Sequence, residues 1–330
     1  MEKEPLVSVI VPNYNYSRYL PERLDSILNQ SFRDFELILL DDASTDESVQ
    51  IMERYKAQHP DTRIIVNEKN GGSPFRQWMK GIQLARGKWI WIAEADDVAS
   101  PDFLAACMDA LAGHPKAVAC LTGIQLIGPE GEPLPGKGNY WDGFPHYTTR
   151  PSACFDGRFY VNHKLYWSCC MSNASAVVFS RQAALRLTDS PFLSMRHSGD
   201  WLFWVQMALQ GDVVEVYRNL DFFRRHDACV TLGGKKTGRG IEEDIFVVSE
   251  VECALPDIPR YKKRLCHGML YRRIKHLPLT DREKDRYFAL LAERLKGTKK
   301  DYTLLLWNQY LRVVCPWLLT WKRDRTLLPD

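Results

Sequence analysis

Short apolar runs alternate with helical stripes along residues 6–95. Each run is rich in β-branched or aromatic residues, as in a buried strand, while the segments between them place apolar residues on one helical face. The expected strands are residues 6–12, 35–40, 63–66 and 89–93, and the expected helices begin near Leu20, at the capping-box pattern of Ser44 to Glu47, and at Ser73. Alternation of this kind forms βαβ units, so the sequence predicts an α/β fold with a doubly wound, mostly parallel sheet.

Polar residues follow three of these strands where each strand ends. They are Asp41-Asp42, Asn70-Gly71-Gly72, and the acids that begin at Glu94. Ligands bind open parallel sheets at the carboxyl ends of the strands. Turns favour Asp, Asn and Gly on their own account, but this preference explains one such end more easily than three. We therefore expect a ligand site at this edge.

The acids Glu94, Asp96 and Asp97 are close enough to need a cation among them. Side chains alternate along a strand, so Glu94 and Asp96 share a face. Like charges repel at such distances, and Mg²⁺ or Mn²⁺ takes oxygen ligands and bridges to phosphate oxygens. The alternative is that an acid serves only the turn before a helix capped by Ser100. The pattern favours a divalent metal site.

Beyond residue 115 the pattern becomes less regular. Residues 117–127 and 213–217 read as strands, and residues 128–157, rich in Gly, Pro and aromatics, predict a functional loop or lid. Residues 201–209 form an almost wholly apolar helix, introduced by Asp200. Asp200 is either the cap of that helix or a carboxylate base.

From about Ile241 the chain becomes helical and basic. Residues 255–330 contain 18 Lys and Arg against 8 Asp and Glu, whereas the preceding 254 residues contain 26 against 33. Residues 302–321 are amphipathic and rich in tryptophan, with basic residues on both sides. Two interpretations stay open: binding to an anionic membrane surface through residues 260–325, or ordinary packing on the body. Nucleic acid is not expected, since no recognisable module accompanies the charge.

The composition is that of a soluble globular protein, with 45% hydrophobic and 26% charged residues. Nine cysteines without metal-ligand spacing or a disulfide framework favour reduced thiols. The sequence contains no uninterrupted run of about 18 apolar residues, so we expect no transmembrane helix. We also recognise no signal peptide. The expected location is cytoplasmic, with peripheral attachment to the cytoplasmic membrane face as the alternative.

These motifs, in this order, resemble those of family 2 glycosyltransferases with the GT-A fold, of the bacterial surface-glycan type. Residues 7–15 resemble the family's opening, 40–46 its second signature, 94–97 its DxD-type metal motif, 199–201 its later acidic motif and 223–226 its Arg-x-His element. The resemblance covers roughly residues 5–230. It implies a GT-A domain over residues 1–240, with a nucleotide-sugar-binding half (1–115) and an acceptor-binding half (116–240), followed by a helical region (241–330).

The resemblance further implies the reaction and the roles of individual residues. A sugar would move with inversion from a UDP, dTDP or GDP sugar to a hydroxyl of a glycan or lipid-linked saccharide, with Mn²⁺ or Mg²⁺ as cofactor. Asp200 would be the catalytic base. Nucleotide-sugar binding would involve Pro12, Asn13, Tyr14, Asp41, Asp42, Asp46, Gly71, Arg76 and Asp96. Metal binding would involve Asp96, Glu94, Asp97 and His226.

Three departures from the family pattern bear on these roles. Glu94 stands where Asp is usual, Gly199 stands where Glu is frequent, and residues 72–81 replace an Ala-Ala-Arg-Asn pattern, which leaves Arg76 and Lys80 as rival cations. Two other function classes stay open. A sugar nucleotidyltransferase would carry a Gly-rich loop after the first strand, which is missing here. A non-catalytic nucleotide-sugar-binding or scaffold protein would tolerate loss of Asp200.

Overall fold

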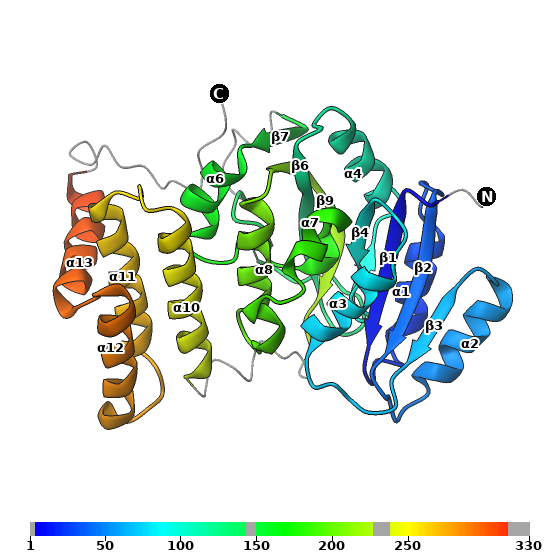
Figure 1. Ribbon diagram of the computed structural model, residues 1–330, viewed down its shortest axis with the longest axis horizontal. Coiled ribbons are helices and arrows are strands. Elements are labelled where there is room, and N and C mark those ends of the chain that lie inside the picture. Colours follow the sequence, from blue (N-terminus) through cyan, green and yellow to red (C-terminus); the bar gives the residue numbers. More distant parts are fainter. Residues whose placement is uncertain (1–3, 137, 143–149, 227–237, 316–330) are drawn as a thin grey trace.

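Figure 1 shows a computed structural model of the chain, in which a mostly parallel sheet is flanked by helices and extended by a helical region. The structure describes residues 4–136, 138–142, 150–226 and 238–315. The strands are β1 (Val7–Asn13), β2 (Phe35–Asp41), β3 (Arg63–Val66), β4 (Trp89–Ile92), β5 (Val98–Ala99), β6 (Ala117–Ile127), β7 (Ser152–Phe155), β8 (Val177–Ser180) and β9 (Asp212–Arg224).

Helices are interspersed with the strands up to β9, and from residue 239 onward helices follow one another without strands in the described residues. The longer ones are α1 (Leu20–Leu28), α2 (Ser48–Gln58), α3 (Pro74–Leu84), α4 (Phe103–Ala112), α8 (Gly199–Ala208), α10 (Arg239–Ala254), α11 (Arg260–Lys275), α12 (Asp281–Leu295) and α13 (Lys299–Val314). Short helices are α6 (Gly157–Tyr160), α7 (Arg181–Ala184), the π-helix η1 (Val161–Leu165) and the 3₁₀ turns η2 (Ala174–Ala176), η3 (Leu185–Leu187) and η4 (Pro191–Ser194).

The nine strands form one sheet in the order β3-β2-β1-β4-β8-β6-β9-β5, with β7 beside β9. Strands β1 to β4 are mutually parallel, and β8 is antiparallel to both β4 and β6. The predicted α/β fold with a mostly parallel sheet is therefore confirmed. The register of β1 and β2 places Asn13 beside Asp41, so the two expected ligand positions are neighbours.

Local details differ from the sequence prediction in two places. The second helix begins at Ser48 rather than at a Ser44 capping box, because the Ser44 hydroxyl is used by Asn13 and Asn15. Within the expected lid at residues 128–157, the structure describes a bridge between Ile127 and Pro133 and the strand β7. Residues 137 and 143–149 of that segment lie outside the described residues.

Two apolar clusters cover the two faces of the sheet. Leu24, Met52 and Phe103 pack helices α1, α2 and α4 on one face. On the other face the cluster includes α3 and α8, and it continues without interruption into the C-terminal helices. Burial on both faces explains the continuous apolar runs of the parallel strands.

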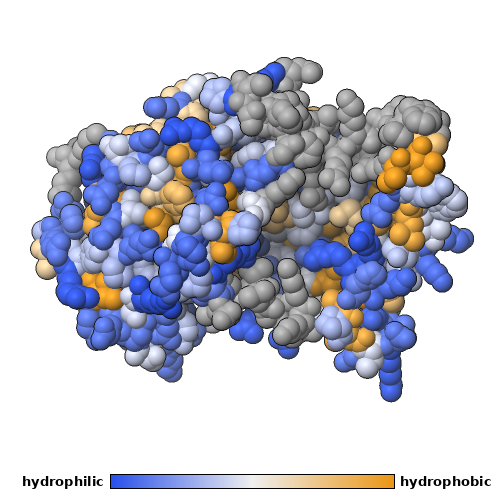
Figure 2. Space-filling view, turned by 180° about the vertical axis from the view of Figure 1, so that it is seen from behind, coloured by the Kyte–Doolittle hydropathy of each residue, from blue (hydrophilic) through white to orange (hydrophobic). Residues whose placement is uncertain are grey.

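The C-terminal helices both pack on the body and expose apolar side chains. Ile245 of α10 and Leu270 of α11 are buried in the cluster that holds Trp201. On α13, in contrast, Trp307 is 59% exposed and Val313 is 82% exposed. Figure 2 shows apolar residues gathered on this side of the molecule. Of the helices in the described ranges, none has the length and apolar character needed to cross a membrane.

Candidate functional site

The ends of β1 and β2 are joined by a hydrogen-bond network around Asp41. The buried Asn13 donates from Nδ2 to Asp41 Oδ2 (2.8 Å) and to Ser44 Oγ (3.1 Å), and the Ser44 amide donates to Asp41 Oδ1 (2.8 Å). Asp41 is fully buried, and Pro12 beside it is also buried, whereas Tyr14 is 45% exposed. The Asn13 Oδ1 atom is buried and has no donor among the described residues. An unpaired acceptor therefore lies at the carboxyl end of β1.

Asp42 connects the end of β2 to the Gly71 loop. Its Oδ1 accepts hydrogen bonds from Asn67 Nδ2 (2.6 Å) and from the Gly71 amide (2.9 Å). The expected pair of Asp42 and Gly71 is thus brought together. Lys80 contacts Asn67 in the same loop, while the Arg76 side chain is exposed. Of the two rival cations, Lys80 is therefore tied to this network.

Asp46 serves the turn between β2 and α2. Its two oxygens accept hydrogen bonds from the backbone amides of Ser17 (2.9 Å) and Ser48 (3.0 Å). Burial works against ionisation, but the hydrogen bonds from Ser48 and Ser17 outweigh it and hold the pKa of Asp46 below its usual range. The structure accordingly gives Asp46 a turn-shaping contact set.

Asp96 and His226 meet at the carboxyl end of β4. Asp96 Oδ2 lies 2.9 Å from His226 Nε2, and the His226 ring packs against Tyr16 and Tyr19 with centroids 5.7 and 5.2 Å apart. The two side chains are 16% and 7% exposed. Two residues that are 130 positions apart in the sequence thus form one polar pair with limited access to solvent.

Asp97 is buried and organises the floor of the site. Its Oδ2 accepts hydrogen bonds from Ser175 Oγ (2.6 Å) and Asn173 Nδ2 (2.8 Å), and its Oδ1 accepts one from the Arg224 amide (3.0 Å). Asn173 also donates to Asp221 Oδ2 (2.8 Å). Burial, and then the charge of Asp96, raise the pKa of Asp97. These contacts make Asp97 a junction between β4, β9 and the turn before β8.

The Glu94 side chain contacts Trp78 and is not hydrogen-bonded to the Asp96–His226 pair. Its Oε1 accepts a hydrogen bond from the indole of Trp78 (2.8 Å). Burial, and then the neighbouring charge of Asp96, raise the pKa of Glu94 from 4.5 to about 8. The third expected acid is therefore held in a position where its neutral form is favoured.

A divalent ion fits the Asp96–His226 pair better than the full acidic set. Two adjacent ligands of an octahedral ion with bonds of about 2.1 Å are separated by about 3.0 Å, close to the observed separation. Within the described residues, no group of three or more His, Cys, Asp or Glu is arranged to hold a metal ion alone. The pair thus suits an ion that takes its other ligands from phosphate oxygens and water.

Asp200 lies in the first turn of α8, and none of its described contacts is with these acids. Burial raises the pKa of Asp200 from 3.8 to about 6, and the charge of Asp244 adds to this effect, while hydrogen bonds from the Trp201 amide and the Cys169 thiol oppose it. A carboxylate with this pKa is ionised at neutral pH and can still accept a proton. That behaviour suits a general base.

Gly199 is required by the packing in front of Asp200. A Cβ atom at this position would lie 2.4 Å from the ring of Phe75, which belongs to α3. The absence of a Glu before Asp200 therefore follows from the close approach of α3 to α8.

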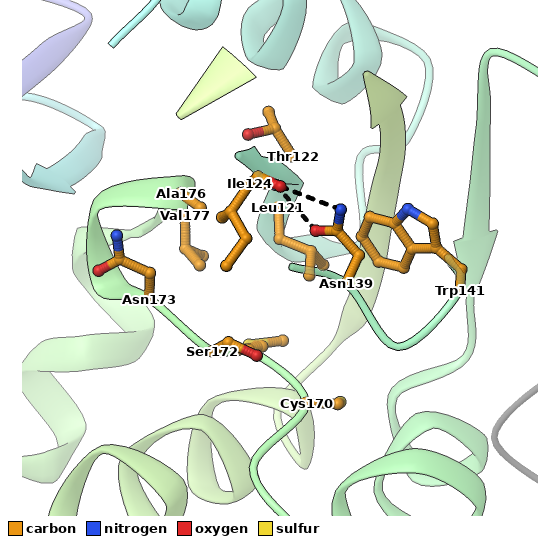
Figure 3. A pocket seen from close by; sticks show the side chains of 11 residues that line it. Leu121, Thr122, Ile124, Asn139, Trp141, Cys170, Ser172, Asn173, Ala176 and Val177 are labelled. Atoms are coloured by element: carbon orange, nitrogen blue, oxygen red, sulfur yellow. Dashed lines mark hydrogen bonds between the residues drawn. The ribbon is translucent and has the colours of Figure 1, made fainter. Parts of the chain in front are cut away.

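Two hollows lie elsewhere in the molecule. Figure 3 shows a pocket of about 10 Å³ beside β6, where the Asn139 amide pairs with the backbone of Ile124. This volume holds roughly one water molecule, which is too little for a sugar. A hollow of about 660 Å³ lies at the amino ends of the strands, near Lys88, Lys116 and Asp212. Neither is lined by the expected catalytic or metal-binding residues.

Four supporting residues were not among the predicted site residues: Asn173, Ser175, Asp221 and Arg224. The fully buried side chain of Arg224 donates to the Asp96 carbonyl oxygen (2.7 Å) and to Glu22 Oε2 (2.6 Å). Arg224 belongs to the Arg-x-His element that the sequence does reveal, so this residue carried a signal. The other three residues precede a strand or lie in one, and no sequence motif marked them.

The fold and the motifs at the strand ends define the class of this protein, an α/β protein related to those that handle nucleotide sugars. Within that class, the chain belongs to glycosyl transferase family 2. The family model matches residues 8–182. Similar proteins include a chondroitin synthase of Escherichia coli, 36% identical over 110 residues that make up 33% of this chain and 16% of that protein. Another is the putative teichuronic acid biosynthesis glycosyltransferase TuaG of Bacillus subtilis, 30% identical over 131 residues, or 40% of this chain and 51% of that protein. The matched stretch thus spans about half of these relatives or less.

Solved structures share the fold at low sequence identity. The S. aureus TarS fragment 1–349 in complex with UDP-GlcNAc superposes with a TM-score of 0.66 and 17% identity, covering 91% of this chain and 83% of that one. The mannosyltransferase PcManGT of Pyrobaculum calidifontis, in complex with GDP-Man and Mn²⁺, gives 0.59 and 17%, covering 96% and 83%. The expected GT-A type fold is confirmed.

Proposed function

We propose that this protein transfers a sugar from a nucleoside-diphosphate sugar to a hydroxyl of a glycan or lipid-linked acceptor, with inversion at the anomeric carbon. The observation that carries the proposal is the Asp96–His226 pair at the end of β4, together with the separate Asp200 carboxyl of raised pKa. Transfer to a hydroxyl needs both a cationic site for a diphosphate and a base. The UDP-GlcNAc and GDP-Man complexes of the structural neighbours support this donor class.

The donor base is proposed to bind at the end of β1. The buried Pro12 and the exposed Tyr14 form the slot, and the unpaired Asn13 Oδ1 accepts a hydrogen bond from an N–H of the base. Asp41 lies beneath the slot and holds Asn13 through Nδ2, which fixes the direction of the amide. Asp42, through the Gly71 amide, and Asp46, through its turn, shape the ribose side.

The diphosphate is proposed to bind beside the Asp96–His226 pair. Mn²⁺ or Mg²⁺ bound there would neutralise the charge that develops on the leaving diphosphate. Asp96 would be the carboxylate ligand and His226 the imidazole ligand, with Arg76 as an exposed cation for the phosphates. Glu94 and Asp97 are engaged by Trp78, Ser175 and other donors, so we assign them to the frame of the site.

Asp200 is proposed to remove the proton from the acceptor hydroxyl as the oxygen attacks the anomeric carbon. The raised pKa of Asp200 lies closer to neutral pH than that of an ordinary carboxyl group, and this favours proton transfer. Inversion requires the acceptor oxygen to attack from the face opposite the leaving diphosphate, so Asp200 on α8 would act from that face.

Attachment to an anionic membrane surface is proposed for the face of α13. Leu306, Trp307, Tyr310, Val313 and Val314 are all at least 43% exposed. Their spacing places them on one side of the helix, and Lys299 and Lys300 precede them. An apolar, aromatic face with nearby lysines suits the lipid headgroup region. Residues 316–325, which belong to the same expected membrane contact, lie outside the described residues.

Replacement of Asp200 by Asn tests the proposed reaction. The variant keeps the shape of the side chain but cannot accept the proton, so transfer should fall by about 10²- to 10⁴-fold. Nucleotide binding should remain unchanged, because no described donor-site contact involves Asp200. Product formation from UDP, GDP and dTDP sugars would be measured beside nucleotide affinity. Wild-type turnover in Asp200→Asn would refute the base assignment.

A further inference from the structure

Glu243 lies early in α10, outside the stretch matched by the family model, and faces the loop that leads into α8. Its Oε1 accepts a hydrogen bond from the Arg196 amide (2.9 Å), and its Oε2 accepts two, from the amides of His197 (2.8 Å) and Ser198 (2.8 Å). Hydrogen bonds to an ionised acceptor are stronger than neutral ones. Three consecutive backbone donors are therefore fixed by a single carboxylate.

A second contact supports the same loop. The Ser198 hydroxyl donates to Asp244 Oδ1 (2.7 Å), and Asp244 forms an ion pair with Arg273 of α11 (2.5 Å). Asp244 is buried, whereas the Arg273 side chain is 53% exposed, so this pair lies at the surface end of the contact. The loop is thus connected through α10 to the next helix of the C-terminal region.

The other side of Asp200 also depends on α10. Glu252 Oε1 accepts a hydrogen bond from the Tyr166 hydroxyl (2.6 Å) and lies 2.7 Å from His267 Nε2 of α11. Tyr166 precedes the segment that carries Cys169, whose thiol contacts the Asp200 carboxylate. The helix α10 therefore holds both segments that flank Asp200.

We propose that Glu243 is a positioning residue for sugar transfer, which fixes the loop 196–198 and through it the direction of the Asp200 carboxylate. It follows that the helical region from residue 239 is part of the catalytic unit and not a separate appendage. This inference rests on the proposed role of Asp200. A base must lie within about 2.6–3.2 Å of the proton that it removes, and a misplacement of about 1 Å can cost about 10²-fold in rate.

Replacement of Glu243 by Gln tests the proposal with little change in shape. The amide has one acceptor oxygen in place of two and no charge, so it cannot hold all three amides equally well. We expect kcat to fall by about tenfold or more, by the same positioning argument. The KM for the donor and the affinity for nucleotide should stay at the wild-type level, and amide hydrogen exchange at residues 196–198 should become faster.

Glu242→Gln is the matched control. Glu242 is the preceding residue on α10, and its carboxylate pairs with the exposed Arg286 on the surface. This variant should keep wild-type kcat and wild-type exchange in the loop. It carries the same change of charge and chemistry without touching residues 196–198.

Three outcomes would overturn the proposal. Unchanged exchange at residues 196–198 in Glu243→Gln would show that the carboxylate does not fix the loop. Faster exchange with wild-type kcat would show that the fixed loop does not position the base. A joint loss of nucleotide affinity and kcat would show that the Glu243 carboxylate supports the whole fold and does not specifically position the base. Wild-type turnover by Asp200→Asn would instead refute the proposed role of Asp200 as the base, and the exchange result would stand apart from it.

Discussion

At the scale of single residues, the site uses burial to give similar carboxyl groups different properties. Burial and the charge of Asp96 raise the pKa of Glu94 to about 8, whereas hydrogen bonds from two backbone amides hold the pKa of Asp46 low. Asp200 lies between these extremes, with a pKa of about 6. The pKa of Asp97 is also raised to about 6, but its two oxygens are occupied by Ser175, Asn173 and the Arg224 amide, so Asp200 is the better placed of the two to exchange a proton near neutral pH.

The first prediction at this scale concerns pH. Since Asp200 must be ionised to act as a base, kcat/KM for the acceptor should fall below about pH 6, by about tenfold per pH unit. The measurement uses saturating donor, and nucleotide affinity is determined at each pH to separate donor binding from proton transfer. A profile that stays flat to well below pH 5 would contradict the assignment.

The second prediction concerns Gly199. Replacement by Ala places a methyl group against the Phe75 ring, so α3 or α8 must shift. We expect a loss of about 1–3 kcal/mol in the free energy of unfolding, measured by denaturant titration. Gly113→Ala is the control, because a Cβ atom there has no atom within 4 Å. Equal stability of the two variants would show that this contact is not tight.

At the scale of elements, the strands and their polar ends could be predicted because short-range pattern determines them. Apolar runs, turn residues and motif order all lie within a few neighbours along the chain. The long-range contacts could not be predicted. Asn173 reaches Asp97 across 76 residues, and Arg224 reaches it across 127. Likewise the Ser44 capping box is absent because Asn13, from another strand, uses the hydroxyl.

The Glu243 contacts are also long-range contacts that the sequence could not predict. The sequence marks residues 199–201 as an acidic motif, but it gives no sign that a carboxylate more than 40 residues later holds the amides before it. Only the packing of α10 against α8 reveals the relation. Sequence motifs therefore identified the proposed reacting groups better than the groups that hold them in place.

At the scale of the whole molecule, one apolar cluster runs from the sheet through α8 into the C-terminal helices. Figure 1 shows these helices as a layer beyond α8, and they bring the exposed face of α13 to one side of the protein. A single body thus combines the proposed donor site with the proposed membrane contact.

A vesicle-binding experiment tests the membrane contact. Replacing Trp307, Tyr310 and Val313 together by Ser should reduce sedimentation with vesicles that contain anionic lipid by about tenfold or more. Each replacement removes apolar area that the side chain would bury in the lipid. Val66→Ser is the control, because Val66 is 47% exposed on β3 at the other end of the sheet. Wild-type protein that does not bind such vesicles, or a triple variant that binds equally well, would refute this proposal.

The most direct test of the whole account is a calorimetric titration of UDP, GDP and dTDP with and without Mn²⁺, on wild type and on Asp96→Ala. The account predicts that one nucleotide binds wild type in a Mn²⁺-dependent manner, because Asp96 and His226 together suit an ion that also takes phosphate oxygens. Asp96→Ala should lose that dependence. Failure of all three nucleotides to bind wild type, or Mn²⁺-dependent binding that persists in Asp96→Ala, would contradict the account.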